Sequence, residues 1–154
     1  MTKLQVAPIN ILLADDDDDD CLFFSKALKE LPIATNLTII HDGEQLIKYL
    51  CKNPENLPDV LFLDLSMPRK TGFECLAEIH DTENLKHIPV VVFTISYPHN
   101  PEFEAEIAKT LASMGAQNYI KKNSDLTKLK QAIHHALILL TEKLPPAEQV
   151  EKKQ

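Results

Sequence analysis

Three short segments of the sequence, residues 11–13, 60–63 and 90–93, are apolar at every position and rich in branched side chains. A strand with one face in water alternates apolar and polar residues, whereas a strand covered on both faces is apolar throughout. Segments with the helical spacing of apolar residues lie between these runs, which is typical of βαβ units around a parallel sheet. The sequence therefore predicts an α/β domain in which these three segments are the central strands.

The complete pattern contains five strand segments and five helical segments. We expect strands at residues 9–14, 36–41, 59–64, 89–94 and 117–120. In the helical segments the apolar residues recur at intervals of three and four, so that one face of each helix can be buried. The residues expected on these buried faces are Phe24, Leu28, Leu31, Leu46, Ile47, Leu50, Phe73, Leu76, Ala77, Phe103, Ile107, Leu111, Met114, Leu126, Leu129, Ile133, Leu137 and Leu140.

Length and composition limit the class of protein and its partners. The 154 residues are enough for one domain, expected at residues 8–142, with a flexible polar tail at residues 143–154. A net charge of -7 has the wrong sign for contacts with phosphates, which argues against nucleic acid as a partner. The apolar runs are too short for a bilayer, no signal peptide pattern is present, and the three cysteines form no C-x-x-C pair. These features predict a reduced, cytoplasmic protein without a membrane segment.

Six consecutive aspartates, residues 15–20, follow the first predicted strand. Acidic runs are usually solvated, and some of these residues could simply cap the next helix, which is the interpretation favoured for Asp18 and Asp19. Asp15 and Asp16 differ because they stand at the carboxyl end of a buried parallel strand, where open α/β sheets bind ligands. Like charges repel at such a place unless a cation offsets them, and oxygen ligands favour Mg²⁺ over Zn²⁺.

Asp64 ends a second central strand at the same predicted edge of the sheet. Alone it could be a helix cap, but three acids at one edge are better explained by a magnesium site. We expect carboxylate oxygens of Asp16 and Asp64 and the backbone carbonyl of Ser66 as ligands, completed by water. Asp15 is expected to hold one of these waters.

Thr94 and Lys122 stand at the ends of two further strands. Taken alone, Thr94 would be interpreted as an ordinary strand residue and Lys122 as an ordinary surface residue. Phosphoryl transfer requires an in-line nucleophile, a metal ion and fixed positive charge, and these residues with the acids would supply all three. Asp64 is then the nucleophile that forms an aspartyl phosphate, Lys122 provides a point charge and Thr94 a hydroxyl donor.

This pattern resembles the receiver domain of two-component response regulators over about residues 8–140. The resemblance rests on the acid pair after the first strand, the segment D-L-S-M-P at residues 64–68 followed by Gly72, Thr94, and the segment from Gly115 to Lys122. It implies a flavodoxin-like three-layer sandwich, with a five-stranded parallel sheet of order 2-1-3-4-5 and five helices. It also implies Mg²⁺-dependent phosphorylation of Asp64 by a histidine kinase or phosphotransfer protein, with slow autodephosphorylation as the only enzymatic activity.

The resemblance implies a conformational switch as well. In the family, phosphorylation draws the residue that matches Thr94 inward, and the aromatic residue that matches Tyr119 follows. The face formed by the fourth helix, fifth strand and fifth helix is thereby remodelled for a downstream protein target. Thr94 and Tyr119 are the expected switch residues.

The sequence departs from the family pattern at three places. Asn123 stands where proline usually follows the lysine, so we expect a trans peptide bond or an altered loop there. Ile95 is bulkier than the family's usual residue after Thr94, and residues 96–101 form a longer segment than in minimal receivers. That longer segment resembles stand-alone receivers that partner phytochrome-type histidine kinases.

Several alternatives stay open at this stage. Only 14 residues follow Leu140, which favours a single-domain regulator, and the apolar run 136–140 fits a deeply packed helix and a homodimer seam about equally well. A phosphatase with a nucleophilic aspartate would need an acid at the position of Ser66. A degenerate receiver that acts as a docking module without phosphorylation remains compatible with Asn123 and Ile95.

Overall fold

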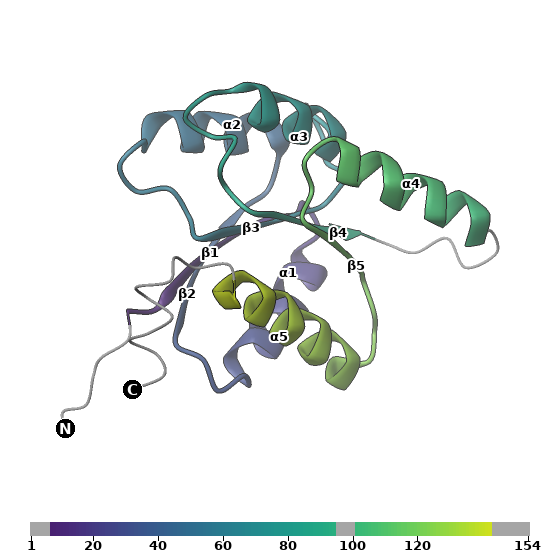
Figure 1. The fold of residues 1–154 in the computed structure, drawn as a ribbon. Helices are drawn as coiled ribbons and strands as arrows, with labels where there is room; N and C mark the ends of the chain where they lie inside the picture. The colour runs from purple at the N-terminus through teal and green to yellow at the C-terminus, as the bar shows by residue number, and fades with distance from the viewer. Residues whose placement is uncertain (1–6, 95–100, 143–154) are drawn as a thin grey trace.

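The computed structural model describes residues 7–94 and 101–142, in which strands and helices alternate (Figure 1). The strands are β1 (Ile9–Ala14), β2 (Thr35–Ile40), β3 (Val60–Leu63), β4 (Val90–Thr94) and β5 (Asn118–Lys121). The helices are α1 (Asp18–Lys29), α2 (Gly43–Lys52), α3 (Gly72–Asp81), α4 (Pro101–Ser113) and α5 (Leu126–Glu142). The predicted sequence of five strands and five helices is confirmed.

The five strands form one parallel sheet in the order β2-β1-β3-β4-β5. The expected strand order is therefore confirmed, and the three fully apolar segments are the interior strands β1, β3 and β4. All residues of β3 and β4 are buried, whereas the edge strand β2 has two exposed residues. Burial on both faces explains why the interior strands lack the usual alternation of apolar and polar residues.

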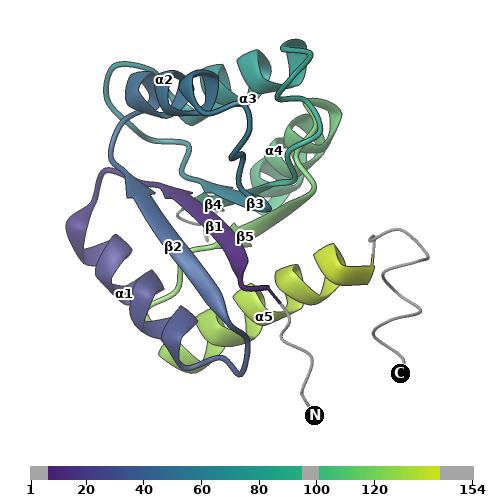
Figure 2. The same ribbon diagram turned by 90° about the vertical axis from the view of Figure 1, so that its left-hand side faces the viewer.

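Helices cover both faces of the sheet and give the molecule three layers (Figures 1 and 2). Helices α1 and α5 lie on one face, and α2, α3 and α4 lie on the other. Alternate side chains of β1 enter different cores, with Leu12 packed among residues of α2 and α3, and Leu13 among residues of α1 and α5. The sheet therefore separates two apolar cores, and its strand ends remain available at the edge of the middle layer.

Side chains just before three helices cap their first turns. The Asp17 carboxylate accepts a hydrogen bond at the start of α1, and Asp42 does so at the start of α2. Thr71 and Glu74 form a reciprocal capping box at the start of α3. Such caps satisfy N–H groups that have no partner within the helix, so they determine where each helix begins.

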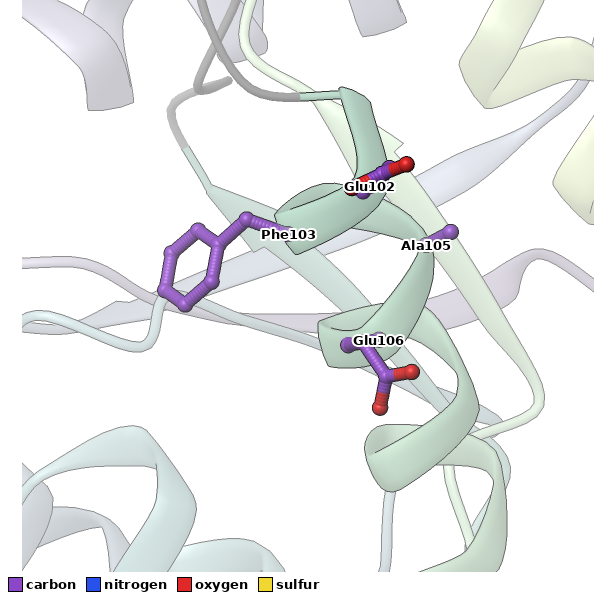
Figure 3. A pocket seen from close by; sticks show the side chains of 4 residues that line it. All are labelled: Glu102, Phe103, Ala105 and Glu106. Carbon is purple, nitrogen blue, oxygen red and sulfur yellow. The ribbon is translucent and has the colours of Figure 1, made fainter.

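The structure corrects some of the expected boundaries and faces. Strand β2 begins and ends one residue earlier than expected, and β5 begins and ends one residue later. Phe73 and Phe103, both expected in the core, are 38% and 46% exposed. Ala77 is also exposed. Phe103 points away from the axis of α4 and lines a surface hollow of about 550 Å³ with Glu102, Ala105 and Glu106 (Figure 3).

The apolar run near the end of α5 divides between core and surface. Ala136 and Leu137 are buried beside α1, whereas Ile138 is 40% exposed. The homodimer stays a prediction.

Residue 95, the segment 96–100 and the tail 143–154 lie outside the described residues. No helix within the described ranges has the length and apolar character needed to cross a membrane.

Candidate functional site

Three carboxylates meet at the carboxyl edge of the sheet. Asp15 follows β1 and Asp64 follows β3, and these neighbouring strands are joined by a hydrogen bond of 2.9 Å from the Asp64 N–H to the Ala14 carbonyl. One carboxylate oxygen from each of Asp15, Asp16 and Asp64 can be chosen so that all three lie within 4.8 Å of one another. The structure thus brings together the three acids that the sequence analysis singled out.

The loop after β1 orients Asp15 toward the interior. The backbone N–H of Asp17 donates to Oδ1 of Asp15 at 3.0 Å, and the Cys21 thiol donates to the Asp15 carbonyl at 3.4 Å. The Asp15 side chain is fully buried, while Asp16 is exposed. One acid therefore lies beneath the site, and its neighbour faces solvent, from which a ligand could enter.

The loop after β3 approaches the site closely. The Gly72 N–H donates to the Leu65 carbonyl at 2.9 Å, and a Cβ atom at position 72 would lie only 2.2 Å from the backbone oxygen of Asp64. A side chain at this position would displace the backbone that carries Asp64. The Ser66 N–H donates to Oδ1 of Asp64 at 3.4 Å. The role expected for the Ser66 carbonyl as a metal ligand stays a prediction.

Lys122 places its ammonium group among the carboxylates. Its Nζ lies 2.7 Å from Oδ2 of Asp20, 2.9 Å from Oδ2 of Asp15 and 3.5 Å from Oδ2 of Asp64. The ammonium is also 5.4 Å from the centre of the Phe93 ring, within reach of a cation–π contact. The Lys122 side chain is 12% exposed, so it contributes a largely buried positive charge to an otherwise acidic cluster.

The other residues expected at the site lie on the adjoining strands. Thr94 ends β4 and is buried, and its carbonyl accepts a hydrogen bond of 2.7 Å from the Lys122 N–H. Lys121, which could have competed for the role of the site lysine, instead pairs with Glu104 of α4 at 2.7 Å. Tyr119 is half-buried and packs against the core beneath α2, α3 and α4. The switching movement of Thr94 and Tyr119 stays a prediction.

Asn123 lies in the loop between β5 and α5, where the chain has no cis peptide bond. The Lys122–Asn123 peptide bond is trans, which is one of the two outcomes expected from the sequence. The Asn123 side chain accepts a hydrogen bond of 2.8 Å from the Asp125 N–H, and the Asp125 carboxylate accepts one of 2.9 Å from the Thr127 N–H. These bonds turn the chain directly into α5 and leave Lys122 pointing into the site.

Burial and charge shift the proton affinities of the site groups. Burial, reinforced by the charge of Asp15, raises the pKa of Asp64 from an ordinary value of 3.8 to about 6. Burial also raises the pKa of Asp15, against the opposing effect of a backbone hydrogen bond and of Lys122. Burial alone would lower the pKa of Lys122, but its hydrogen bond to Asp20 and its close contact with the Asp15 carboxylate outweigh that effect and raise it. The ammonium is therefore charged at neutral pH, and the two buried acids repel each other.

The donor set fits a hard divalent cation. Oδ2 of Asp15 is buried and, among the described residues, receives no hydrogen bond of acceptable geometry, since its contact with Lys122 is an ion pair only. A buried carboxylate oxygen of this kind carries a desolvation cost that a cation offsets. Oxygen-only ligands from Asp15, Asp16 and Asp64 match the preference of Mg²⁺ rather than that of Zn²⁺.

One contact at the site was missed by the sequence analysis. Asp20 lies in the first turn of α1, 102 positions before Lys122, and receives the shortest of the contacts made by that ammonium. Within a run of six aspartates, nothing in the sequence distinguishes Asp20 from its neighbours. The contact arises only when the start of α1 packs beside the end of β5.

Comparisons with known proteins identify the family to which this chain belongs. A family model described as the response regulator receiver domain matches residues 11–134. The response regulator Rcp1 of Synechocystis sp. is 36% identical over 94 residues, which cover 58% of this chain and 64% of Rcp1. The aligned part of the chain thus spans less than two thirds of that relative's length.

Solved structures of similar proteins have the same fold. The Mn²⁺-bound form of Rcp1 matches with a TM-score of 0.73 and 30% identity, covering 90% of this chain and 98% of that one. The phosphorylated cyanobacterial phytochrome response regulator RcpA matches with a TM-score of 0.73 and 27% identity, with the same coverage. The fold, the arrangement of acids and the family match all point to one assignment. The chain belongs to the response regulator receiver domain family of two-component signalling.

Proposed function

We propose that this receiver domain accepts a phosphoryl group on Asp64 in a Mg²⁺-dependent reaction, and that the modification alters its binding to a protein target. The observation that carries the proposal is the meeting of Asp15, Asp16 and Asp64 with the Lys122 ammonium, whose Nζ lies 3.5 Å from Oδ2 of Asp64. A nucleophile, a hard-cation donor set and a fixed positive charge are the components that phosphoryl transfer requires.

The phosphodonor is a histidine kinase or a phosphotransfer protein, the partner class of receiver domains. An Asp64 carboxylate oxygen attacks the phosphorus of the donor's phosphohistidine, and an O–P bond forms as the N–P bond breaks. The electron pair of the broken bond stays on the imidazole nitrogen, which takes up a proton. In this reaction Lys122 faces the negative charge of the transferred group, and the Thr94 hydroxyl donates a hydrogen bond to it.

Asp15, Asp16, Asp64 and the Ser66 carbonyl would hold the metal ion. A bound Mg²⁺ would neutralise negative charge on the phosphoryl oxygens as they approach the acidic pocket. Asp15 orients this arrangement from below, since its Oδ1 is fixed by the Asp17 N–H, and its Oδ2, which forms an ion pair with Lys122, keeps a lone pair for the ion or its water. Asp16, being exposed, offers its carboxylate from the solvent side.

The identity of the donor can be narrowed further. The cyanobacterial phytochrome response regulator RcpA and the bacteriophytochrome response regulator RtBRR are among the similar structures, at 27% and 28% identity. These relatives support a phytochrome-type histidine kinase as the phosphodonor. The three free cysteines, two of them buried, fit a reducing compartment, so we place the protein in the cytoplasm.

The experiment is mass spectrometry after incubation with acetyl phosphate and Mg²⁺. We expect a gain of about 80 Da, one phosphoryl group, that disappears in Asp64→Asn and in EDTA. Asp81→Asn is the matched control, because Asp81 is an exposed acid at the end of α3 and its substitution removes the same charge.

Other outcomes identify the alternatives. An unlabelled wild-type protein would support a docking module that works without phosphorylation. Repeated turnover of a phosphomonoester would instead support a phosphatase. Light scattering with and without beryllofluoride, a phosphoryl analogue, tests the homodimer, and a monomer under both conditions would contradict it.

A further inference from the structure

The Lys122 ammonium is shared by carboxylates from three different elements. Asp15 follows β1, Asp64 follows β3 and Asp20 belongs to the first turn of α1. The distance from Nζ to Asp20 is 2.7 Å, with hydrogen-bond geometry, whereas the distance to Asp64 is 3.5 Å. Since direct hydrogen bonds from an ammonium to a carboxylate are shorter than about 3.2 Å, Lys122 is near Asp64 without bonding to it.

Asp20 has no competing task at the start of its helix. The N-cap of α1 is Asp17, whose carboxylate accepts the Asp20 N–H at 3.1 Å. The carboxylate of Asp20 is therefore available to Lys122, and it is only 37% exposed. Asp18 and Asp19, which precede it, are exposed, with the Asp18 side chain at 93%.

We infer that Asp20 is a positioning residue for phosphoryl transfer, holding the Lys122 ammonium beside Asp64 but out of hydrogen-bond contact with the nucleophilic oxygen. This inference rests on the proposed function. At this distance the ammonium charge still acts on the transferred group, while the lone pairs of Asp64 stay free to attack phosphorus. An ammonium bonded directly to Asp64 would occupy one of those lone pairs and make the carboxylate a poorer nucleophile.

Removal of the Asp20 carboxylate should redirect the lysine. The ammonium has three N–H donors, and in a site this buried a hydrogen bond to a charged carboxylate is stronger than one to a neutral amide oxygen. Without the charge of Asp20, the carboxylates within 4 Å of the ammonium among residues 7–94 and 101–142 are those of Asp15 and Asp64, so the ammonium moves toward the nucleophile. The contact with the Phe93 ring keeps the lysine at the site but offers no charged oxygen to replace the lost carboxylate.

The test compares three variants of the full chain with the wild type, using acetyl phosphate at saturating Mg²⁺. Asp20→Asn should lower the maximal rate constant of phosphorylation about tenfold, equivalent to roughly 1.4 kcal/mol, with an unchanged half-saturating concentration of acetyl phosphate. Asp20→Glu, which restores a carboxylate, should stay within about threefold of wild type. Asp19→Asn is the matched control, since it removes the same charge from the same helical turn at an exposed position and should behave as wild type.

A second measurement follows the lysine itself. The ¹⁵Nζ and ¹³Cε signals of Lys122 should shift in Asp20→Asn and remain in place in Asp19→Asn, because the proposal concerns the contacts of this ammonium. If the substitutions only weakened helix α1, the melting temperature of both variants would change. The Lys122 signals of the two variants would then be the same.

The outcomes separate this inference from the proposed function. If the wild type is phosphorylated but Asp20→Asn equals Asp19→Asn in its rate constant or in its Lys122 signals, the positioning role alone is overturned. Wild-type protein that is not phosphorylated overturns the proposed function, and the positioning role falls with it. A selective loss of rate in Asp20→Asn, with recovery in Asp20→Glu and a shifted Lys122 signal, supports it.

Discussion

Asp64 is a buried carboxylate whose surroundings oppose its own negative charge. It is 3% exposed and lies close to Asp15, and the groups that offset its charge are distant, with the Ser66 N–H at 3.4 Å and the Lys122 ammonium at 3.5 Å. A group in this situation costs stability in its charged form unless a cation is present. Under the proposed function this cost serves the reaction, because the same poorly offset charge would favour a divalent ion and attack on phosphorus.

The raised pKa of Asp64 predicts how stability depends on pH in EDTA. The native carboxyl, with a pKa of about 6, binds its proton more tightly than the unfolded carboxyl at 3.8. The free energy of unfolding should therefore fall as pH rises from about 4 to about 6, by about 1 to 3 kcal/mol from this group. Asp64→Asn should reduce this fall, leaving the part that comes from the raised pKa of Asp15, and should be more stable than wild type at pH 7, as measured by urea unfolding across that pH range.

Asp81→Asn provides the comparison for this prediction, because it removes an exposed acid outside the site. It should keep the pH dependence of the wild type. The prediction would be contradicted if Asp64→Asn and Asp81→Asn gave parallel curves, since the acid repulsion at the site would then contribute nothing to stability.

At the scale of single residues, the sequence predicted where each site residue stands in the parallel sheet, but it predicted only some of the contacts between their side chains. Asp15, Asp64 and Thr94 each follow or end a strand, and parallel strands all end at one edge, so their convergence follows from the strand assignment. The pairing of Lys122 with Asp20 does not follow from it. That contact depends on how far α1 leans toward β5, which no local pattern encodes.

The helices are held to the sheet by a few large side chains. The Phe24 ring of α1 meets the rings of Phe62 and Phe93 edge-on, with centroids 5.0 and 5.4 Å apart. These rings join α1 to β3 and β4 beneath the site, and Phe93 also contacts the Lys122 ammonium. Packing of α1 therefore supports both the core and the position of the site lysine.

The contrast between two phenylalanines tests this account of packing. Phe24→Ala, at a fully buried position, should lower the free energy of unfolding by about 3 to 5 kcal/mol because it leaves a cavity among aromatic rings. Phe103→Ala, at a position 46% exposed, should cost less than about 1 kcal/mol. Urea unfolding followed by circular dichroism measures both, and similar losses in the two variants would contradict the assignment of core and surface.

Helical periodicity explains why Phe73 and Phe103 were misplaced. The spacing of apolar residues identifies the face of a helix that turns inward, but not the point along the axis where that face passes beyond the sheet. Both residues lie in the first turns of their helices, α3 and α4, and the start of α4 lies at the margin of the molecule (Figure 1). Their exposure follows from the lengths and placement of neighbouring elements.

At the scale of the whole molecule, the sheet has an apolar, stable interior and one edge at which negatively charged side chains repel one another. Two apolar cores lie on its opposite faces, and the acids are gathered where the interior strands β1 and β3 end. The chain as a whole carries a net charge of -7. A divalent cation bound at that edge would relieve local repulsion and stabilise the folded state relative to the unfolded chain.

Binding of Mg²⁺ should therefore raise the melting temperature. At a Mg²⁺ concentration one hundred times the dissociation constant, linkage predicts a stabilisation of about 2.7 kcal/mol, or about 5 to 10 °C. Asp16→Asn should abolish most of this shift without disturbing the core, since Asp16 is exposed. Differential scanning fluorimetry in matched ionic strength measures the effect.

Asp18→Asn is the control for this measurement, because Asp18 is an exposed acid in the same run. It should retain the Mg²⁺-dependent shift. Equal shifts in Asp16→Asn and Asp18→Asn would mean that Mg²⁺ acts by screening the general negative charge, and would contradict a defined site.

The sequence by itself determined the number and type of elements, the three interior strands, and the edge where Asp15, Asp16, Asp64, Thr94 and Lys122 would gather. It could do so because burial on both faces and parallel pairing impose patterns that are readable along the chain. The order of the strands came from the family resemblance. Only the tertiary structure decided that Asp20 pairs with Lys122 and that Phe73 and Phe103 face solvent, because such contacts depend on packing distances between elements far apart in the sequence.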